Sequence, residues 1–205
     1  MSGRYPILAA EHAHEEILRR SRFLTLLAPV ESEDQARAFL AARREAGPDA
    51  NHHCWAYLIG PPGSSSRVGR SDAGEPSGTA GRPMLDVLTH SGVGDIVAVC
   101  SRWFGGTLLG RGGLVQAYGG GVKAALENAP LTEKVHRVEL ELDLDYATRD
   151  AVRRLYPVFE VELLEEGFGV GLLHRLRLPA ERELAFAQAL LDLSNGQLVP
   201  RPIGD

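Results

Sequence analysis

The stretch "DIVAVCSRWFGGTLLGRGGLVQAYGGG", residues 95–121, decides how the chain folds. Residues 95–104 are almost all apolar, which is the pattern of a central strand buried on both faces. A glycine-rich loop follows, and residues 112 to about 128 predict a helix whose small residues allow close packing on a sheet. This order of strand, loop and helix indicates a sheet covered by helices.

Further elements are predicted on both sides of this stretch. The predicted strands are two short runs around residues 19–22, then residues 52–60, 138–144, 158–164 and 168–177, and a last one near 197–202. The predicted helices are residues 31–47, capped by Ser32 and ended by Gly47-Pro48, then 82–92, 112–128, 147–155 and 181–193. The glycines Gly167 and Gly169 mark the turn between the two middle strands of the second half.

Around residues 128–134 the glycine-rich, apolar pattern ends, and apolar and polar residues alternate strictly from residue 138 to 144. We therefore expect one α/β domain over residues 1–130 and a second over 131–205. The predicted order in the second domain is β-α-β-β-α-β, which is the order of the ferredoxin-like split unit. The fold class expected for the whole chain is α+β.

Composition bounds the possible functions. The chain has 205 residues, of which 44% are hydrophobic and 24% charged, as in an ordinary globular protein. No apolar run is long enough to cross a membrane, and the acidic start does not resemble a signal peptide, so we expect a cytoplasmic protein. The net charge is −5. Residues 1–130 carry as many basic as acidic side chains, so any nucleic-acid binding must depend on a local patch.

The first candidate motif is "SDAGEPSGTAG", residues 71–81. Asp72 and Glu75 are two carboxylates that could hold a divalent cation or act as acid and base, and Ser77 and Thr79 could orient a ligand. The alternative is a structural loop, in which Ser77 or Thr79 caps the following helix and the carboxylates accept hydrogen bonds from loop amides. The residues alone leave both interpretations open.

The second candidate motif is the loop "FGGTLLGRGGL", residues 104–114. Gly105, Gly106, Gly110, Gly112 and Gly113 could expose amide groups at a helix N-terminus, where an anion is favoured. Arg102 and Arg111 flank the loop and could bind phosphate or carboxylate through two N–H groups. The spacing fits neither a Walker loop nor a dinucleotide fingerprint, and the alternative is a crossover packed tightly on the sheet.

Other residues carry weaker signals. "HHC" at residues 52–54 lacks further ligands at a zinc spacing, so no metal is assigned, and His52 is interpreted as a packed histidine or one in the wall of a site. Cys54 and Cys100 are interpreted as small buried hydrophobic residues rather than a disulfide framework. No cofactor is predicted.

These strings resemble the YigZ/IMPACT family over nearly the whole chain. The resemblance rests on "SRF", "HHCWAYLIG", "SDAGEPSGTAGRPMLDVL" and "VAVCSRWFGGTLLGRGGLVQAY". It implies an N-terminal domain of the ribosomal protein S5 domain 2 type and a C-terminal ferredoxin-like domain. Both domain types resemble modules of elongation factor G, which points to RNA or the ribosome. The resemblance supplies no catalytic activity.

The resemblance also marks positions in this chain. The matching signature residues are His52, Asp72, Gly74, Glu75, Ser77, Gly78, Thr79, Gly81, Arg102, Phe104, Gly105, Gly106, Leu109, Gly110, Gly112, Gly113 and Leu114. Two positions depart from the family pattern. Ala73 stands where the family usually has a second acid, which weakens any mechanism that needs adjacent carboxylates, and Trp103 stands where it has tyrosine.

Three functions follow as hypotheses. The leading one is a translation-associated protein that binds RNA or a ribosomal surface through residues 67–113. The side chains expected to contact phosphates are Arg67, Arg70, Arg82, Arg102 and Arg111. The second is an enzyme acting on a small phosphorylated or carboxylated substrate, with Glu75 or Asp72 as base or metal ligand. The third is an adaptor that binds another protein.

Overall fold

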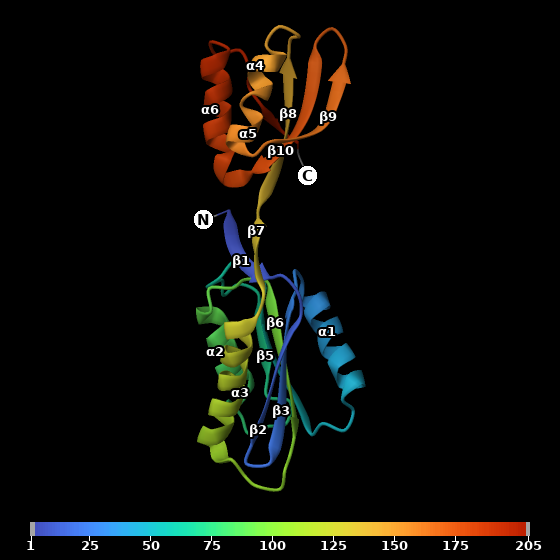
Figure 1. Ribbon diagram of the computed structural model, residues 1–205, viewed down its shortest axis with the longest axis vertical. Helices are drawn as coiled ribbons and strands as arrows, with labels where there is room; N and C mark the ends of the chain where they lie inside the picture. Colours follow the sequence, from blue (N-terminus) through green and yellow to red (C-terminus); the bar gives the residue numbers. More distant parts are fainter. Residues whose placement is uncertain (1–2, 204–205) are drawn as a thin grey trace. The chain divides into compact units, whose positions relative to one another are not determined.

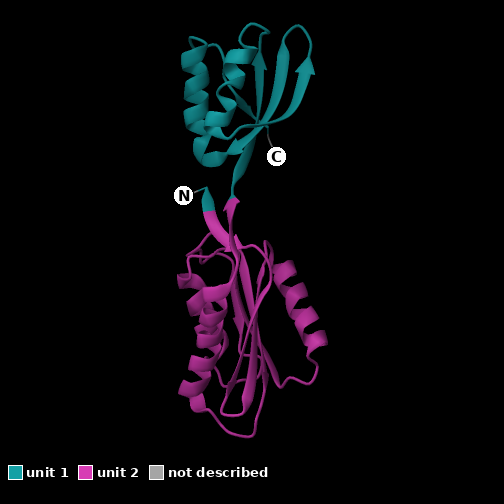
Figure 2. Cartoon of the chain, viewed as in Figure 1, with its two compact units in different colours: residues 1–4, 135–205 teal, residues 5–134 magenta. Residues whose placement is uncertain are grey.

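The computed structural model describes residues 3–203, which divide into two compact units. One unit is residues 5–134, and the other is residues 1–4 with 135–205 (Figure 2). The predicted domain boundary at about residue 131 falls in strand β7 (Leu131–Val135), which pairs with strand β1 (Arg4–Leu8). The sequence analysis predicted neither of these two strands.

An antiparallel sheet forms the centre of residues 5–134 (Figure 1). Its strand order is β2-β3-β6-β4-β5. The bounds are His12–Leu18 for β2, Ser21–Pro29 for β3, His52–Leu58 for β4, Val68–Ser71 for β5 and Ile96–Trp103 for β6. The apolar run β6 is the middle strand, and its first seven residues are buried, as predicted. The edge strand β5 was not predicted.

Helices cover both faces of this sheet (Figure 1). The bounds are Glu33–Ala46 for α1, Gly81–His90 for α2 and Gly110–Asn128 for α3. Because side chains alternate along a strand, Ala98 and Cys100 of β6 pack in the cluster with α2 and α3, whereas Val97 and Val99 pack in the cluster with α1. As predicted, the Ser32 hydroxyl caps α1 by accepting from the Gln35 amide.

The second unit has its own sheet, whose strand order is β11-β8-β10-β9. Its strands are β8 (Arg137–Leu144), β9 (Glu162–Phe168), β10 (Leu172–Pro179) and β11 (Arg201–Pro202), and all paired neighbours are antiparallel. Helices α4 (Arg149–Arg153), α5 (Tyr156–Phe159) and α6 (Glu183–Leu193) supply the rest of the unit, with a 3₁₀ turn at Ala180–Arg182. Its core is a separate cluster built around Leu140, Leu176 and Phe186. The chain is therefore an α+β protein.

Three predicted elements of this unit need correction. The strand predicted over residues 158–164 begins only at Glu162, because residues 156–159 form helix α5. The helix predicted over residues 147–155 is the short helix α4, and α5 follows it. The turn between the middle strands lies at residues 169–171, where the Gly169 amide donates to the Gly171 carbonyl, and Gly167 lies within β9.

No helix within residues 3–203 combines the length and apolar character that crossing a membrane would require.

Candidate functional site

A cleft lies where the two glycine-rich loops meet at one end of the first sheet. Strand β4 begins and strand β6 ends at this point, since His52 and Arg102 are register partners. The loop after β5 supplies one wall and the loop after β6 the other. The cleft has a volume of about 490 Å³. Its lining residues are Asn51, His52, Gly74, Glu75, Pro76, Arg102, Phe104, Leu108, Leu109, Gly110, Arg111 and Leu114.

Glu75 lies at the base of this cleft, with only 3% of its side chain exposed. Its Oε1 atom accepts from Arg102 Nη1 at 2.6 Å and from the Tyr118 hydroxyl at 2.7 Å. Its Oε2 atom has no hydrogen-bond partner among the described residues. A buried carboxylate is costly unless it is paired and hydrogen-bonded, so the Arg102 and Tyr118 contacts are what hold this charge in place.

Arg102 is buried, and its guanidinium group contacts side chains inside the site. Its guanidinium carbon lies 5.3 Å from the centre of the Phe23 ring and 5.5 Å from that of Phe104. Its Nη2 is 3.5 Å from Ser21 Oγ, and its buried Nε has no partner within residues 3–203. Arg102 lines the cleft, and its direct contact with phosphate stays a prediction. Its charge is used to balance Glu75.

His52 is fixed beside Glu75 in a definite tautomer. Its Nδ1 lies 2.9 Å from the Ala73 carbonyl oxygen, which can only accept, so Nδ1 carries the hydrogen. In the neutral ring Nε2 is then an acceptor, and it lies 3.9 Å from Glu75 Oε1. The Ala73 contact therefore leaves Nε2 as the ring nitrogen that is directed toward Glu75.

Asp72 has a structural role at the start of helix α2. Its carboxylate accepts hydrogen bonds from the amides of Gly78, Ala80 and Gly81 at 2.8–2.9 Å. Although burial works to raise it, these amides hold the pKa of Asp72 below its ordinary value. The predicted pair of free carboxylates does not form, because Asp72 binds backbone amides and Glu75 binds Arg102.

The predicted cap of α2 is also corrected. Neither Ser77 nor Thr79 caps this helix, whose N-cap residue Ala80 has no side-chain cap. The Thr79 hydroxyl instead donates to the Pro76 carbonyl at 2.6 Å within the loop. Asp72, eight residues before the N-cap, satisfies the first amides of the helix.

The loop after β6 packs on the turn between β2 and β3 (Figure 1). A Cβ atom at Gly105 would lie 1.9 Å from the Arg20 carbonyl oxygen, so only glycine fits this approach. The Gly105 amide donates to Ser21 Oγ, and Arg19 Nη1 donates to the Leu108 carbonyl. These contacts bring the arginines of the β2–β3 turn to the edge of the cleft.

Helix α3 begins at the cleft, two residues earlier than predicted. Gly110, the first residue of α3, has a φ of +74°, which glycine adopts without strain. Its N-cap residue Leu109 makes no side-chain cap, and no carboxylate within residues 3–203 accepts from its first amides as Asp72 does from those of α2. Arg111 Nη2 donates to the Ser77 carbonyl at 2.8 Å and so links the two loops.

The comparisons with known proteins cover the whole of this site. A family model described as the Impact N-terminal domain matches residues 19–126. The chain belongs to the IMPACT family. Curated IMPACT family members from Haemophilus influenzae and Escherichia coli, the latter named YigZ, are 44% and 42% identical over 90% and 89% of this chain and 90% of each relative. A solved structure titled "Crystal structure of an hypothetical protein" is 40% identical and superposes with a TM-score of 0.70 over 100% of this chain and 99% of that one.

The IMPACT signature residues divide into two groups in space. Those that line the cleft are His52, Gly74, Glu75, Arg102, Phe104, Leu109, Gly110 and Leu114, and the predicted site residue Arg111, which lies outside the signature, lines it as well. The other predicted site residues support the loops behind it, namely Asp72, Ser77, Thr79, Gly105, Gly106, Gly112 and Gly113. Tyr118 was missed as the second partner of Glu75. Its hydroxyl on the buried face of a helix, one turn after Leu114, is the only signal that the sequence offers.

The two departures from the IMPACT pattern are neighbours in sequence of the cleft residues Gly74 and Arg102, and neither lines the cleft. Ala73 has a φ of +45° and contributes its carbonyl group to His52, so its backbone rather than its side chain is used. The Trp103 ring carries the Arg22 guanidinium, whose carbon lies 4.4 Å from the ring centre.

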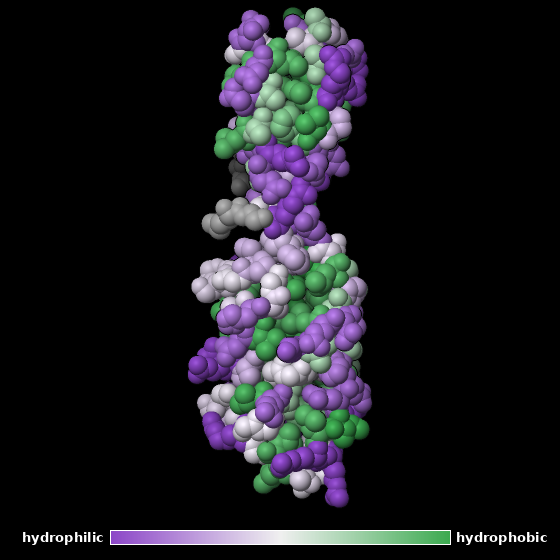
Figure 3. Space-filling view, turned by 60° about the vertical axis from the view of Figure 1, so that its left-hand side comes forward, coloured by the Kyte–Doolittle hydropathy of each residue, from purple (hydrophilic) through white to green (hydrophobic). Residues whose placement is uncertain are grey.

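Arg111 lines the cleft, and Arg19 and Arg20 lie on the β2–β3 turn that packs on one of its loops; we call these three exposed arginines the arginine rim. Within residues 3–203 none of the three has a carboxylate partner, whereas neighbouring Arg22 is paired with Glu15. Figure 3 shows hydrophilic side chains projecting at the end of residues 5–134 that carries the β6–α3 loop. The sequence analysis interpreted Arg19 and Arg20 only as a hairpin turn.

Proposed function

We propose that this IMPACT family chain is a cytoplasmic, translation-associated protein that binds RNA or a ribosomal surface through the arginine rim. The observation that carries the proposal is the rim itself: Arg111 at the cleft and Arg19 and Arg20 on the adjoining β2–β3 turn, none of which has a carboxylate partner within residues 3–203. Arginine is suited to phosphate because its planar guanidinium donates two parallel hydrogen bonds.

Because the arginine rim is a local group of charges, it is compatible with the zero net charge of residues 1–130. Residues 1–130 are neutral in sum, so a nucleic-acid surface requires arginines that are not already balanced by acids. The rim meets this requirement. Arg102 does not, because it is paired with Glu75, and Arg67 lies beside Ile59 at the far end of β4 from His52.

The enzymatic alternative has less support from the geometry. Asp72 is occupied by three amides, so it is not available as a base or a metal ligand. Within the described chain no group of three His, Cys, Asp or Glu side chains could hold a metal ion. Glu75 is the remaining carboxylate, and its charge is balanced by Arg102.

The finer domain assignments are part of the proposal. For residues 135–205 the strand order β11-β8-β10-β9 with a β-α-β-β-α-β sequence supports a ferredoxin-like domain. For residues 5–134 the S5 domain 2 type rests on the family resemblance.

The test is RNA binding by a variant that lacks the rim charges. We expect wild-type protein to bind a short single-stranded RNA of mixed sequence at low salt, measured by fluorescence anisotropy. Arg19→Gln/Arg20→Gln/Arg111→Gln should weaken binding by at least about ten-fold, since each lost phosphate contact removes part of the counterion release. Co-sedimentation with ribosomes should fall in parallel.

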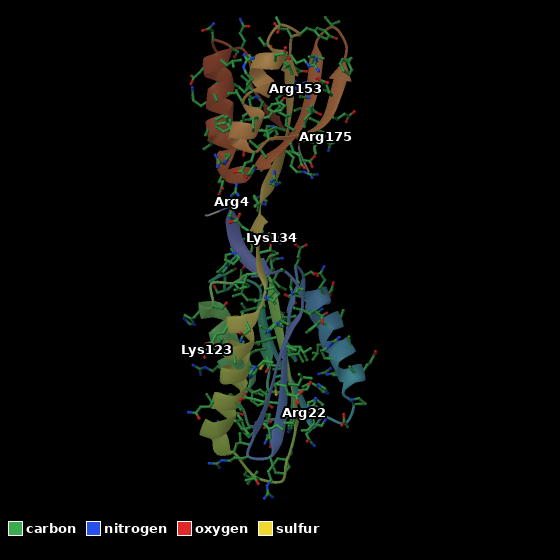
Figure 4. The ribbon with its side chains drawn as sticks, in the orientation of Figure 1. Arg4, Arg22, Lys123, Lys134, Arg153 and Arg175 are labelled. Carbon is green, nitrogen blue, oxygen red and sulfur yellow. The ribbon has the colours of Figure 1, made fainter. Side chains whose placement is uncertain are left out.

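A charge-matched control distinguishes the rim from net charge. Arg37→Gln/Arg67→Gln/Lys123→Gln removes three positive charges from exposed positions that do not line the cleft. Figure 4 shows Lys123 on α3 well away from Arg22 of β3. The control should bind as wild type does. Wild-type protein that binds neither RNA nor ribosomes at low salt would contradict the proposal, and capture of one stoichiometric protein partner without RNA would support an adaptor instead.

A further inference from the structure

The base of the cleft presents hydrogen-bond acceptors, whereas the arginine rim presents donors. Glu75 Oε2 lacks a hydrogen-bond partner within the described chain, although 97% of the side chain is buried and it lines the cleft. His52 Nε2, which is an acceptor when the ring is neutral, lies 3.9 Å from Glu75 Oε1. Oε2 keeps contact with the open space of the cleft, and a carboxylate oxygen can only accept, so the site is suited to a ligand that donates hydrogen bonds.

The charge balance at the base argues for a neutral donor. Arg102 already neutralises Glu75 at 2.6 Å, so a second cation at Oε2 would bring an unbalanced charge into a mostly apolar cleft. An N–H group of a neutral ring does not carry this cost. This favours a heterocyclic base over a lysine side chain or an amino terminus.

The walls of the cleft are suited to a flat ring. Phe104 lines the cleft with 45% of its surface exposed, and Leu108 beside it is 78% exposed. Aromatic side chains at the edge of a single-strand site stack on bases. The volume of about 490 Å³ lies in the range of small-ligand sites.

We propose that this cleft holds one unpaired guanine of the bound RNA, stacked on Phe104 with its Watson–Crick edge directed at Glu75. The inference rests on the proposed function and names the base that the site selects. Guanine is the base with two adjacent donors on that edge, N1–H and the 2-amino group. In adenine and cytosine the amino group lies next to a ring acceptor, and in uracil the single N–H lies between two carbonyl groups. Each of these would bring an acceptor toward Glu75.

The test compares RNAs that differ at one position. A short single-stranded RNA with one central guanine is compared with versions that carry inosine, adenine, cytosine or uracil there. We expect guanine to bind about ten-fold more tightly than adenine, the size of one good pair of base contacts, with inosine in between because it lacks only the 2-amino group.

Two variants and a control identify the residues responsible. Glu75→Gln should abolish the guanine preference, whereas Glu45→Gln, at an exposed position on α1, should keep it. Glu75→Gln also leaves Arg102 buried without its counter-charge, so folding is checked by circular dichroism. Phe104→Leu gives an independent measurement, because loss of stacking should weaken binding of all five RNAs by a similar factor.

The outcomes separate this inference from the proposed function. Salt-dependent RNA binding with no preference for guanine, or a preference unchanged in Glu75→Gln, would overturn the guanine site and leave the arginine rim intact. Absence of RNA binding would overturn both. Competition by N-acetyl-lysine amide but not by guanosine monophosphate would assign the cleft to a protein cation, which also overturns the inference.

Discussion

Asp72 and Glu75 lie three residues apart in one loop, and the fold gives them different roles. Asp72 accepts three amide hydrogen bonds at the start of α2, whereas Glu75 is buried against Arg102 and Tyr118. The two side chains point in different directions. The Asp72 side chain points to the start of α2, and the Glu75 side chain points between β6 and α3. Only Glu75 keeps an oxygen available to a ligand.

The role of Asp72 predicts a pH-dependent loss of stability. Asp72→Asn should lower the free energy of unfolding by about 2 kcal/mol at neutral pH, because charge-assisted hydrogen bonds to the helix amides are lost. The folded pKa of Asp72 lies below its ordinary value, so its contribution is complete above that value and disappears as pH falls through the folded pKa.

Urea unfolding of the two proteins between neutral and acidic pH measures this effect. The difference between wild type and variant should narrow as the solution becomes acidic. Asp86→Asn, an exposed position on the same helix, is the control and should behave as wild type. A constant difference across the pH range would contradict the role of Asp72.

At the residue scale, the sequence predicted which residues matter better than what each one does. The strings around Asp72, Glu75 and Arg102 mark the two loops, and both loops border the cleft. Their roles depend on long-range contacts: Glu75 meets Arg102 from 27 residues away and Tyr118 from 43. The role of Asp72 at the start of α2 was not predicted, because a capping side chain is expected at the N-cap residue itself and Asp72 lies eight residues earlier.

At the element scale, prediction succeeded where burial is strong and failed where packing overrides local pattern. Strand β6 and helices α1, α2 and α3 lie close to where the sequence predicted them. Residues 158–159 carry a strand-like pattern, but Phe159 packs on Phe186 with ring centres 5.6 Å apart, and Glu160 leaves the helix with a φ of +56°. Strand β5 was missed because Gly69 lies under the Tyr57 ring and breaks any alternation.

A buried histidine links strands β9 and β10 to helix α5. The His174 side chain is fully buried, with Nε2 at 3.0 Å from Glu166 Oε1 and Nδ1 in contact with the Tyr156 hydroxyl. The carboxylate can only accept, so Nε2 carries the hydrogen and Nδ1 accepts from Tyr156. Burial lowers the pKa of His174 even though Glu166 acts to raise it.

This contact predicts weaker stability in mild acid. In the unfolded chain His174 takes up a proton near its ordinary pKa of about 6.5, whereas the folded state resists protonation. The stability of residues 135–205 should therefore fall as pH drops below that value. Thermal unfolding followed by circular dichroism, from pH about 8 to about 5, should show a smaller decline in His174→Gln than in wild type. Equal declines would contradict this role.

At the scale of the whole molecule, the two units differ in net charge and in the features that each one carries. Each has its own sheet and its own core. The cleft, the arginine rim and the residues matched by the family model all lie in residues 5–134. The acidic excess of the chain lies in residues 131–205. RNA binding is therefore a property that we assign to the first unit.

The salt dependence of RNA binding tests this assignment most directly. For single-stranded RNA, log K falls with log[salt] with a slope of about −0.7 for each phosphate contact. Loss of three contacts in Arg19→Gln/Arg20→Gln/Arg111→Gln should therefore make the slope shallower by about 2 relative to wild type. Arg37→Gln/Arg67→Gln/Lys123→Gln should keep the wild-type slope. Equal slopes for wild type and the rim variant would contradict the assignment of the arginine rim as the RNA-binding surface.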